Sequence, residues 1–179
     1  MNILHGLTGS IASKLSLKLA VEYDKHEHIV KLVTTKNSEY FEPSNWAFNS
    51  SHDDEDEWRI YNNEGKVLHI DLTKWADTLV IAPCTANTLA KIANGISDNL
   101  LTCCARAWDF RKPFIVAPSM NCQMWNHPVT HEHYRKLESW GIRIVYPQEK
   151  LLFCGDYGNG AMANIEDIIA ERPKIERKK

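Results

Sequence analysis

The sequence has no long hydrophobic run and no excess of one charge. Its longest apolar stretches are short, and residues 78–82 are an example. A membrane-spanning helix needs about 20 apolar residues. Lysine and arginine number 21 and aspartate and glutamate 23, which gives a formal net charge of -2. A balanced charge does not favour nucleic acid or an anionic membrane as a partner. We therefore expect neither nucleic acid nor a membrane among its partners.

Cysteine is sparse and follows no pattern of a disulfide framework or a metal site. The five cysteines are odd in number and irregularly spaced, and the eight histidines do not pair with them at ligand spacing. Cysteine pairs at regular spacing are typical of zinc sites and of secreted, disulfide-linked domains. The chain also begins directly with a strand-like pattern rather than with a signal peptide. We expect no metal site and a cytoplasmic location.

The length and composition suit one globular domain. The chain has 179 residues, of which 44% are hydrophobic and 25% charged, as is usual for a domain with one core. We predict that this domain covers residues 1–171. Two stretches look loose: we interpret the acidic residues 51–57 as a solvated loop and the basic residues 172–179 as a mobile tail.

Strand-like and helix-like segments alternate along the chain. The predicted strands lie at residues 2–8, 29–34, 78–82, 113–117 and 142–146, and the predicted helices at residues 10–23, 88–94, 99–108, 128–140 and 165–172. This order predicts an α/β fold that is doubly wound, Rossmann-like or flavodoxin-like, with a mostly parallel sheet and helices on both faces. Ligands bind at the carboxyl ends of the strands in such sheets.

Small polar residues follow three of the predicted strands. Gly9 permits a tight turn and Ser10 caps the next helix, which suits a phosphate group, although the spacing is not that of a dinucleotide fingerprint. Residues 35–38 supply further hydroxyl and amide groups. Asn87, in the third loop, offers a donor and an acceptor to the edge of a flat ring. Each loop is equally open to interpretation as an ordinary helix cap.

Three other segments contain reactive or unusual side chains. His69 lies in an apolar context, where a packed structural histidine is the more common case. Asn121 lies between two methionines and a tryptophan, which indicates a partly apolar pocket with one fixed polar group, or else a loop that fills the core. Cys154 begins a glycine-rich loop that we interpret as a flexible flap, with the thiol as a proton donor or as a spectator at a surface turn.

In this order, the segments resemble those of the homo-oligomeric flavin-containing cysteine decarboxylases. The resemblance runs from residue 6 to residue 163. Its most specific parts are the motif Pro-x-Met-Asn-x-x-Met-Trp at residues 118–125 and the run Cys-Gly-Asp-Tyr-Gly-Asn-Gly at residues 154–160. Both are long enough to make chance agreement improbable. The acidic residues 51–57 are not part of the pattern.

The resemblance implies a flavoprotein domain that binds FMN between the subunits of a homotrimer, or of a multiple of trimers. Phe41 is implied to lie near the flavin of a neighbouring subunit. The other cofactor contacts that the resemblance implies are Gly9, Ser10, Ile11, Thr35, Asn37 and Ser38 for the phosphate and ribityl chain, and Thr85, Ala86, Asn87, Thr88 and Ser119 for the ring.

The activity implied by the resemblance is FMN-dependent decarboxylation of 4'-phosphopantothenoylcysteine to 4'-phosphopantetheine, a step of coenzyme A biosynthesis. It proceeds by thiol oxidation, loss of CO2 and re-reduction. His69 is implied to be the active-site histidine and Cys154 the proton donor. The implied substrate contacts, in which Asn121 holds the carboxylate, are Asn121, Met124, Leu151, Leu152 and Phe153.

Two alternatives within the same family stay open. One is oxidative decarboxylation of a peptide that ends in cysteine. Its enzymes stop at the enethiol and need no final proton donor, so the Cys154 flap argues against it. The other is a catalytically silent regulatory subunit. Such relatives lack one of the catalytic groups, whereas this chain has His69, Asn121 and Cys154, but the acidic residues 51–57 keep this alternative open.

Overall fold

A parallel β-sheet forms the centre of the molecule. The computed structural model describes residues 1–41 and 51–171, so the predicted tail at residues 172–179 lies outside the described residues. Six strands pair in the order β3-β2-β1-β4-β5-β6, and every pairing is parallel. They are β1 (Asn2–Leu7), β2 (Ile29–Thr34), β3 (Ser51–His52), β4 (Thr78–Cys84), β5 (Phe114–Pro118) and β6 (Arg143–Ile144).

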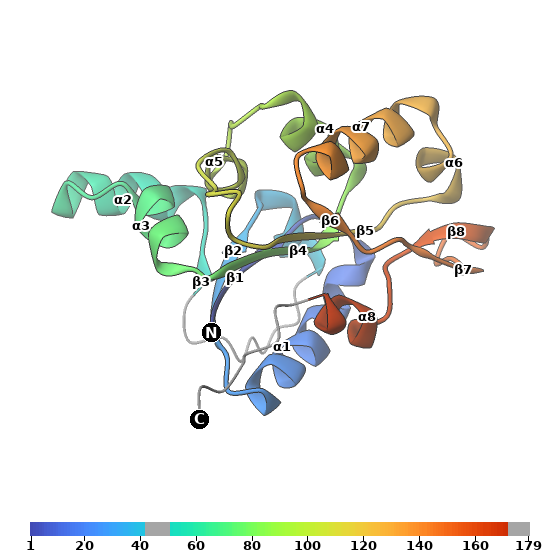
Figure 1. The fold of residues 1–179 in the computed structure, drawn as a ribbon, viewed down its shortest axis with the longest axis horizontal. Helices are drawn as coiled ribbons and strands as arrows, with labels where there is room; N and C mark the ends of the chain where they lie inside the picture. The colour runs from blue at the N-terminus through green and yellow to red at the C-terminus, as the bar shows by residue number, and fades with distance from the viewer. Residues whose placement is uncertain (42–50, 172–179) are drawn as a thin grey trace.

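Helices cover both faces of this sheet (Figure 1). One face packs against α1 (Ser16–Lys25) and α8 (Ile165–Ala170), through a cluster that contains Leu19 and Ile168. The other face packs against α3 (Leu68–Trp75), α4 (Ala86–Asn94), α5 (Leu100–Arg106) and α7 (Pro128–Ser139). The prediction of a doubly wound α/β fold is therefore confirmed.

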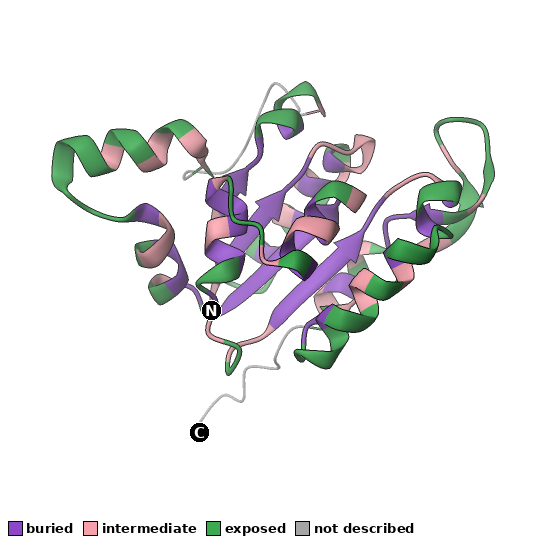
Figure 2. Cartoon of the chain, turned by 90° about the horizontal axis from the view of Figure 1, so that it is seen from above, coloured by how far each residue is buried: buried purple, intermediate pink, exposed green. Residues whose placement is uncertain are grey.

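The central strands are buried on both sides, as Figure 2 shows. All seven residues of β4 are buried. Leu79 and Ile81 belong to the core on one face of the sheet, and Val80 and Ala82 to the core on the other. Successive side chains of a strand point to opposite faces, so a strand between two helical layers is mostly apolar along its whole length.

The strand order creates a crevice between β1 and β4. From β1 the chain moves outward to β2 and β3 and then returns to place β4 on the other side of β1. The loops after β1 and β4 therefore diverge, which is where doubly wound folds bind ligands. Thr8 joins the two loops: its hydroxyl donates to the carbonyl of Pro83 at 2.8 Å and accepts from the backbone N–H of Thr85 at 2.9 Å.

The interpretation of residues 51–57 as a solvated loop is wrong. These residues form the edge strand β3 and the first turn of α2 (Asp54–Glu64). The Asp53 carboxylate caps this helix by accepting from the backbone N–H groups of Glu55 at 2.9 Å and Asp56 at 3.0 Å. Carboxylates at a helix N-terminus interact favourably with the helix dipole. The acidic composition therefore marks the start of a helix.

The glycine-rich segment is more regular than predicted. A hairpin of β7 (Gln148–Leu151) and β8 (Tyr157–Ala161) contains it, and the five residues between these strands form the tip. A Cβ atom on Gly160 would lie 2.2 Å from the carbonyl oxygen of Met120, and the Met120 N–H donates to the Gly160 carbonyl at 2.9 Å. Glycine is therefore needed here for close approach of two backbones, and only the tip has the form of a flap.

Candidate active site

Two adjoining cavities lie along the carboxyl ends of the strands. The first has a volume of about 510 Å³ and is walled by the loops after β1, β4 and β5 and by the β7–β8 hairpin. The second has a volume of about 440 Å³ and is walled by the loops after β1, β2 and β4 and by the starts of α2 and α5. Gly9, Thr85, Ala86 and Met124 line both. Each volume is in the range of small-molecule sites.

The turn after β1 contributes to the walls of both cavities. Ser10 caps the short helix η1 (Ile11–Leu15): its hydroxyl accepts from the Ala12 N–H at 3.3 Å and donates to the Ser119 hydroxyl at 3.1 Å. A Cβ atom on Gly9 would lie 2.6 Å from the Cβ of Asn37. The loops after β1, β2 and β5 thus meet at this turn, and only a residue without a side chain fits there.

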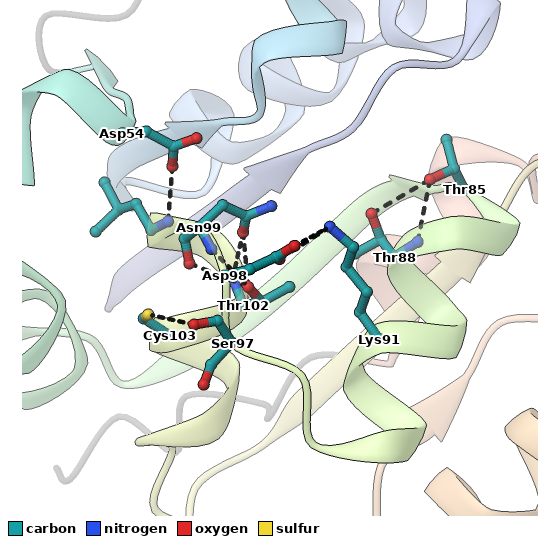
Figure 3. Close-up of polar contacts among 10 residues, drawn as sticks. Asp54, Thr85, Thr88, Lys91, Ser97, Asp98, Asn99, Thr102 and Cys103 are labelled. Carbon is teal, nitrogen blue, oxygen red and sulfur yellow. Dashed lines mark hydrogen bonds and ion pairs between the residues drawn. The ribbon is translucent and has the colours of Figure 1, made fainter.

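Capped helices and one ion pair surround the second cavity (Figure 3). The Thr85 hydroxyl caps α4 by accepting from the Thr88 N–H at 3.3 Å. The Lys91 ammonium donates to the Asp98 carboxylate oxygens at 2.7 and 2.8 Å, and this hydrogen bonding lowers the pKa of Asp98. Asp54 accepts from the Leu100 N–H at 2.7 Å, which joins α2 to α5.

Most of the predicted cofactor contacts line these cavities, and two do not. Ser38 is fully buried, and its hydroxyl donates to the Thr35 carbonyl at 2.7 Å. Phe41 is the last residue of η2 (Lys36–Phe41) and is not among the lining residues. The predicted contacts that do line a cavity are Gly9, Ser10, Ile11, Thr35, Asn37, Thr85, Ala86, Asn87, Thr88 and Ser119.

Asn121 and Cys154 meet in the first cavity, as a joint active-site role requires. Asn121 caps α6 (Cys122–Trp125): its side-chain oxygen accepts from the Gln123 N–H at 2.8 Å, which turns its amide nitrogen toward the hairpin tip. That nitrogen donates to the Cys154 sulfur at 3.2 Å and to the Asp156 carboxylate at 2.8 Å. The Cys154 thiol donates to the same carboxylate oxygen at 3.4 Å.

Asp156 is a member of this cluster for which the sequence predicted no role. It belongs to the Cys-Gly-Asp run on which the resemblance rests, and that run was the available signal. Cys154 is the exposed cysteine of the five. In contrast, burial raises the pKa of the Cys84 and Cys104 thiols, which makes them poor proton donors. The exposed thiol beside an amide and a carboxylate is the chemically available one.

The walls of the first cavity combine apolar surface with positive charge. The predicted substrate contacts Met124, Leu151, Leu152 and Phe153 all line it. The charged residues among its lining are Lys14 and Lys150. An apolar cavity whose charged groups are cationic suits a partly apolar, anionic ligand.

His69 lies apart from Asn121 and Cys154. It is on α3 and is not among the residues that line the two cavities. Its Nδ1 lies 2.8 Å from Glu57 Oε1, and its backbone N–H donates to Glu57 Oε2 at 3.1 Å. An ionised carboxylate can only accept a hydrogen bond, so it favours the tautomer in which Nδ1–H donates to Glu57, and Nε2 then points away from Glu57. Glu57, in the acidic segment first interpreted as a loop, therefore orients the histidine.

The Flavoprotein family model matches residues 1–173, and the chain therefore belongs to this family. It is 49% identical over 164 residues to a probable phosphopantothenoylcysteine decarboxylase of Arabidopsis thaliana, covering 90% of this chain and 81% of the relative.

Two solved structures share the fold. A PPC decarboxylase mutant complexed with pantothenoylaminoethenethiol has a TM-score of 0.89 at 46% identity, with 94% of each chain covered. The FMN binding protein AtHal3 has a TM-score of 0.85 at 46% identity, with 94% of this chain and 92% of that chain covered.

The groups that line the cavities fit FMN. Hydroxyl and amide side chains from the loops after β1, β2 and β4 suit the phosphate and ribityl oxygens and the polar edge of the ring, and they come from Ser10, Thr35, Asn37, Thr85, Asn87 and Thr88. No group of three or more potential metal ligands occurs within residues 1–41 and 51–171. In the same residues, no helix is both long and apolar enough to span a membrane.

Proposed function

We propose that this flavoprotein removes CO2 from the cysteine end of 4'-phosphopantothenoylcysteine and yields 4'-phosphopantetheine. The observation that carries the proposal is the pairing of the Asn121 amide with the exposed Cys154 thiol, at 3.2 Å, in a cavity with cationic and apolar walls. The names of the relative from Arabidopsis thaliana and of the PPC decarboxylase structure support it. We assign the activity to a flavoprotein domain at residues 1–171.

The loops at the carboxyl ends of the strands would hold FMN. Ser10 and Gly9 would approach its phosphate, and Thr85 to Thr88 the edge of its ring. When bound, FMN supplies the redox chemistry that makes CO2 loss possible, because it accepts two electrons from the thiol-bearing end of the substrate and later returns them. The close approach of Gly9 to Asn37 keeps the walls of this site together.

The residues of the first cavity would bind and protonate the substrate. The Asn121 amide would hold the carboxylate, since its nitrogen points into the cavity while its oxygen is used as a helix cap. Cys154 would give its thiol proton to the carbon skeleton in the final reduction. Lys14 and Lys150 would attract the anionic substrate, and the hairpin residues 151–153 would cover its apolar middle.

His69 would act in the site of a neighbouring subunit. It is not among the residues that line the cavities of its own chain, yet its ring is held by Glu57 with one nitrogen free and its side chain is 25% exposed. We therefore propose a homotrimer, or a multiple of trimers, in which His69 of one subunit assists proton removal from substrate bound to the next. The cytoplasmic location inferred from the sequence stays a prediction.

The proposal is tested by anaerobic incubation of the FMN-loaded protein with 4'-phosphopantothenoylcysteine, read by mass spectrometry. Formation of 4'-phosphopantetheine without an added oxidant is the expected result. A peptide that ends in cysteine serves as the competing substrate. Conversion of the peptide alone would move the activity to peptide decarboxylation. No conversion of either compound by a fully loaded protein would favour the regulatory alternative and contradict the proposal.

A further inference from the structure

The amide that faces the first cavity already binds a carboxylate of the protein itself. The Asn121 nitrogen donates to Asp156 Oδ2 at 2.8 Å, the shorter of its two contacts with the hairpin tip. Hydrogen bonds between an amide and an ionised carboxylate are stronger than those between neutral groups. The position of the Asn121 amide is therefore one that accommodates a carboxylate.

The same amide cannot serve Asp156 and a substrate carboxylate together. Its two hydrogens are directed to Asp156 and Cys154, and its oxygen accepts from Gln123. A second carboxylate at this nitrogen would also face the first at short range, and two like charges at one site repel each other. Binding of an acidic substrate thus requires Asp156 to leave.

The hairpin is built so that Asp156 can move away from Asn121 while the base of the hairpin stays in place. The base is anchored by the hydrogen bond from the Met120 N–H to the Gly160 carbonyl. The tip turns at Gly155, whose φ is +90°, and both Cys154 and Asp156 are exposed. Among the described residues, the Asp156 side chain forms hydrogen bonds with Asn121 and Cys154.

We propose that Asp156 is an internal stand-in for the substrate carboxylate: it occupies Asn121 in the free enzyme, is displaced when substrate binds, and returns after CO2 has left. The inference rests on the proposed function, because it assumes an acidic substrate. Cys154 contacts both Asn121 and Asp156, so the thiol returns to Asn121 together with Asp156. The proton donor is therefore at Asn121 only when the substrate carboxylate is absent, which sets the order of CO2 loss and protonation.

The test compares two ligands that differ only in the carboxylate. One is 4'-phosphopantothenoylserine, in which a hydroxyl replaces the thiol, and the other is the corresponding ethanolamine amide, which lacks the carboxylate. Their dissociation constants are measured by calorimetry with the FMN-loaded protein. We compare the wild type, Asp156→Asn, and Glu149→Gln, which removes the same charge from an exposed position of β7 that does not line the cavity.

Asp156→Asn is expected to bind the serine compound about tenfold more tightly, because a neutral amide competes less well for Asn121 and does not repel the ligand. The ethanolamine compound should bind within about twofold of its wild-type affinity, and Glu149→Gln should change neither value by more than this. A purely structural effect on the hairpin would alter the affinities for both ligands alike.

An equal change for the two ligands, or no change for either, would overturn the proposal. Asp156→Ala provides a second variant with the same expected selectivity if Asp156→Asn loses FMN. Failure of the proposed function itself has a different signature. In that case the wild type releases no CO2 from 4'-phosphopantothenoylcysteine and does not bind the serine compound, whereas failure of the stand-in leaves both properties intact.

Discussion

A buried histidine in the central sheet should make the protein less stable at mildly acidic pH. His5 lies in β1 and is fully buried. Its Nε2 lies 2.8 Å from the Ala82 carbonyl and its Nδ1 3.2 Å from the Tyr23 hydroxyl. Burial disfavours the charged form and lowers the pKa of His5 from 6.5 to about 4. The folded protein therefore keeps this ring neutral over a range in which the unfolded chain protonates it.

The size of the effect follows from the two pKa values. The folded pKa is the lower one, so between about pH 6.5 and about pH 4 the unfolded state binds more protons and the free energy of unfolding falls as pH falls. At about 1.4 kcal/mol per pH unit, the full loss is about 3 kcal/mol. Between about pH 7.5 and about pH 5 the loss is about 2 kcal/mol.

The assay is urea unfolding of the FMN-loaded protein at about pH 7.5 and about pH 5, with one ionic strength and one protomer concentration. The matched variant is His5→Gln, because its side-chain amide does not titrate and can donate to the Ala82 carbonyl. The drop in unfolding free energy between the two pH values should be about 2 kcal/mol smaller in the variant. Other titrating groups are common to both proteins. Equal pH dependence in the two would refute the reasoning.

Three substitutions test the assigned roles. His69→Asn should bind FMN but release no CO2, and normal release measured with labelled substrate would contradict its role. Cys154→Ser should release CO2 and stop at the enethiol, whereas full conversion to 4'-phosphopantetheine by mass spectrometry would exclude the thiol as proton donor. Gly9→Ala should weaken FMN binding by about tenfold or more in a fluorescence titration, because its Cβ would lie 2.6 Å from the Asn37 Cβ and force the loops apart. Unchanged FMN affinity would show that the loops after β1 and β2 can move apart without disturbing the FMN site.

The central fold was predictable because its central strands are buried and mostly apolar. The sequence predicts a strand buried on both faces at residues 78–82, and in the structure this strand is two residues longer and ends at Cys84. The edge strand β3 escaped prediction, because its two residues are too few for any periodicity. β6 is equally short but lies within the strand predicted at residues 142–146. The acidic start of α2 was misread because charge was taken as a sign of solvation, although the Asp53 and Asp56 spacing is that of a capping box.

The position of the site was predictable, and the partners of its reactive groups were not. A parallel sheet brings the ends of its strands to one edge, so the loops that contain Ser10, Thr85 and Asn121 had to lie near one another. The positions of the Asp156 and Glu57 carboxylates depend on how the β7–β8 hairpin and α2 fold back against the sheet. A pattern in a single sequence does not specify the distances from these carboxylates to Asn121 and His69. Both carboxylates then contact a residue assigned to catalysis, at 2.8 Å in each case.

The two carboxylates act at two separate places. Glu57 orients His69, which does not line the cavities of its own chain, and Asp156 accepts a hydrogen bond from the Asn121 amide of the first cavity. The helix that carries Glu57 has no buried residue, and its Trp58 and Tyr61 are 68% and 54% exposed. Large exposed aromatic side chains are typical of interfaces. In the proposed trimer, a second copy that covers α2 would also bring its cavity to His69, so that subunit contact would complete the site from which substrate displaces Asp156.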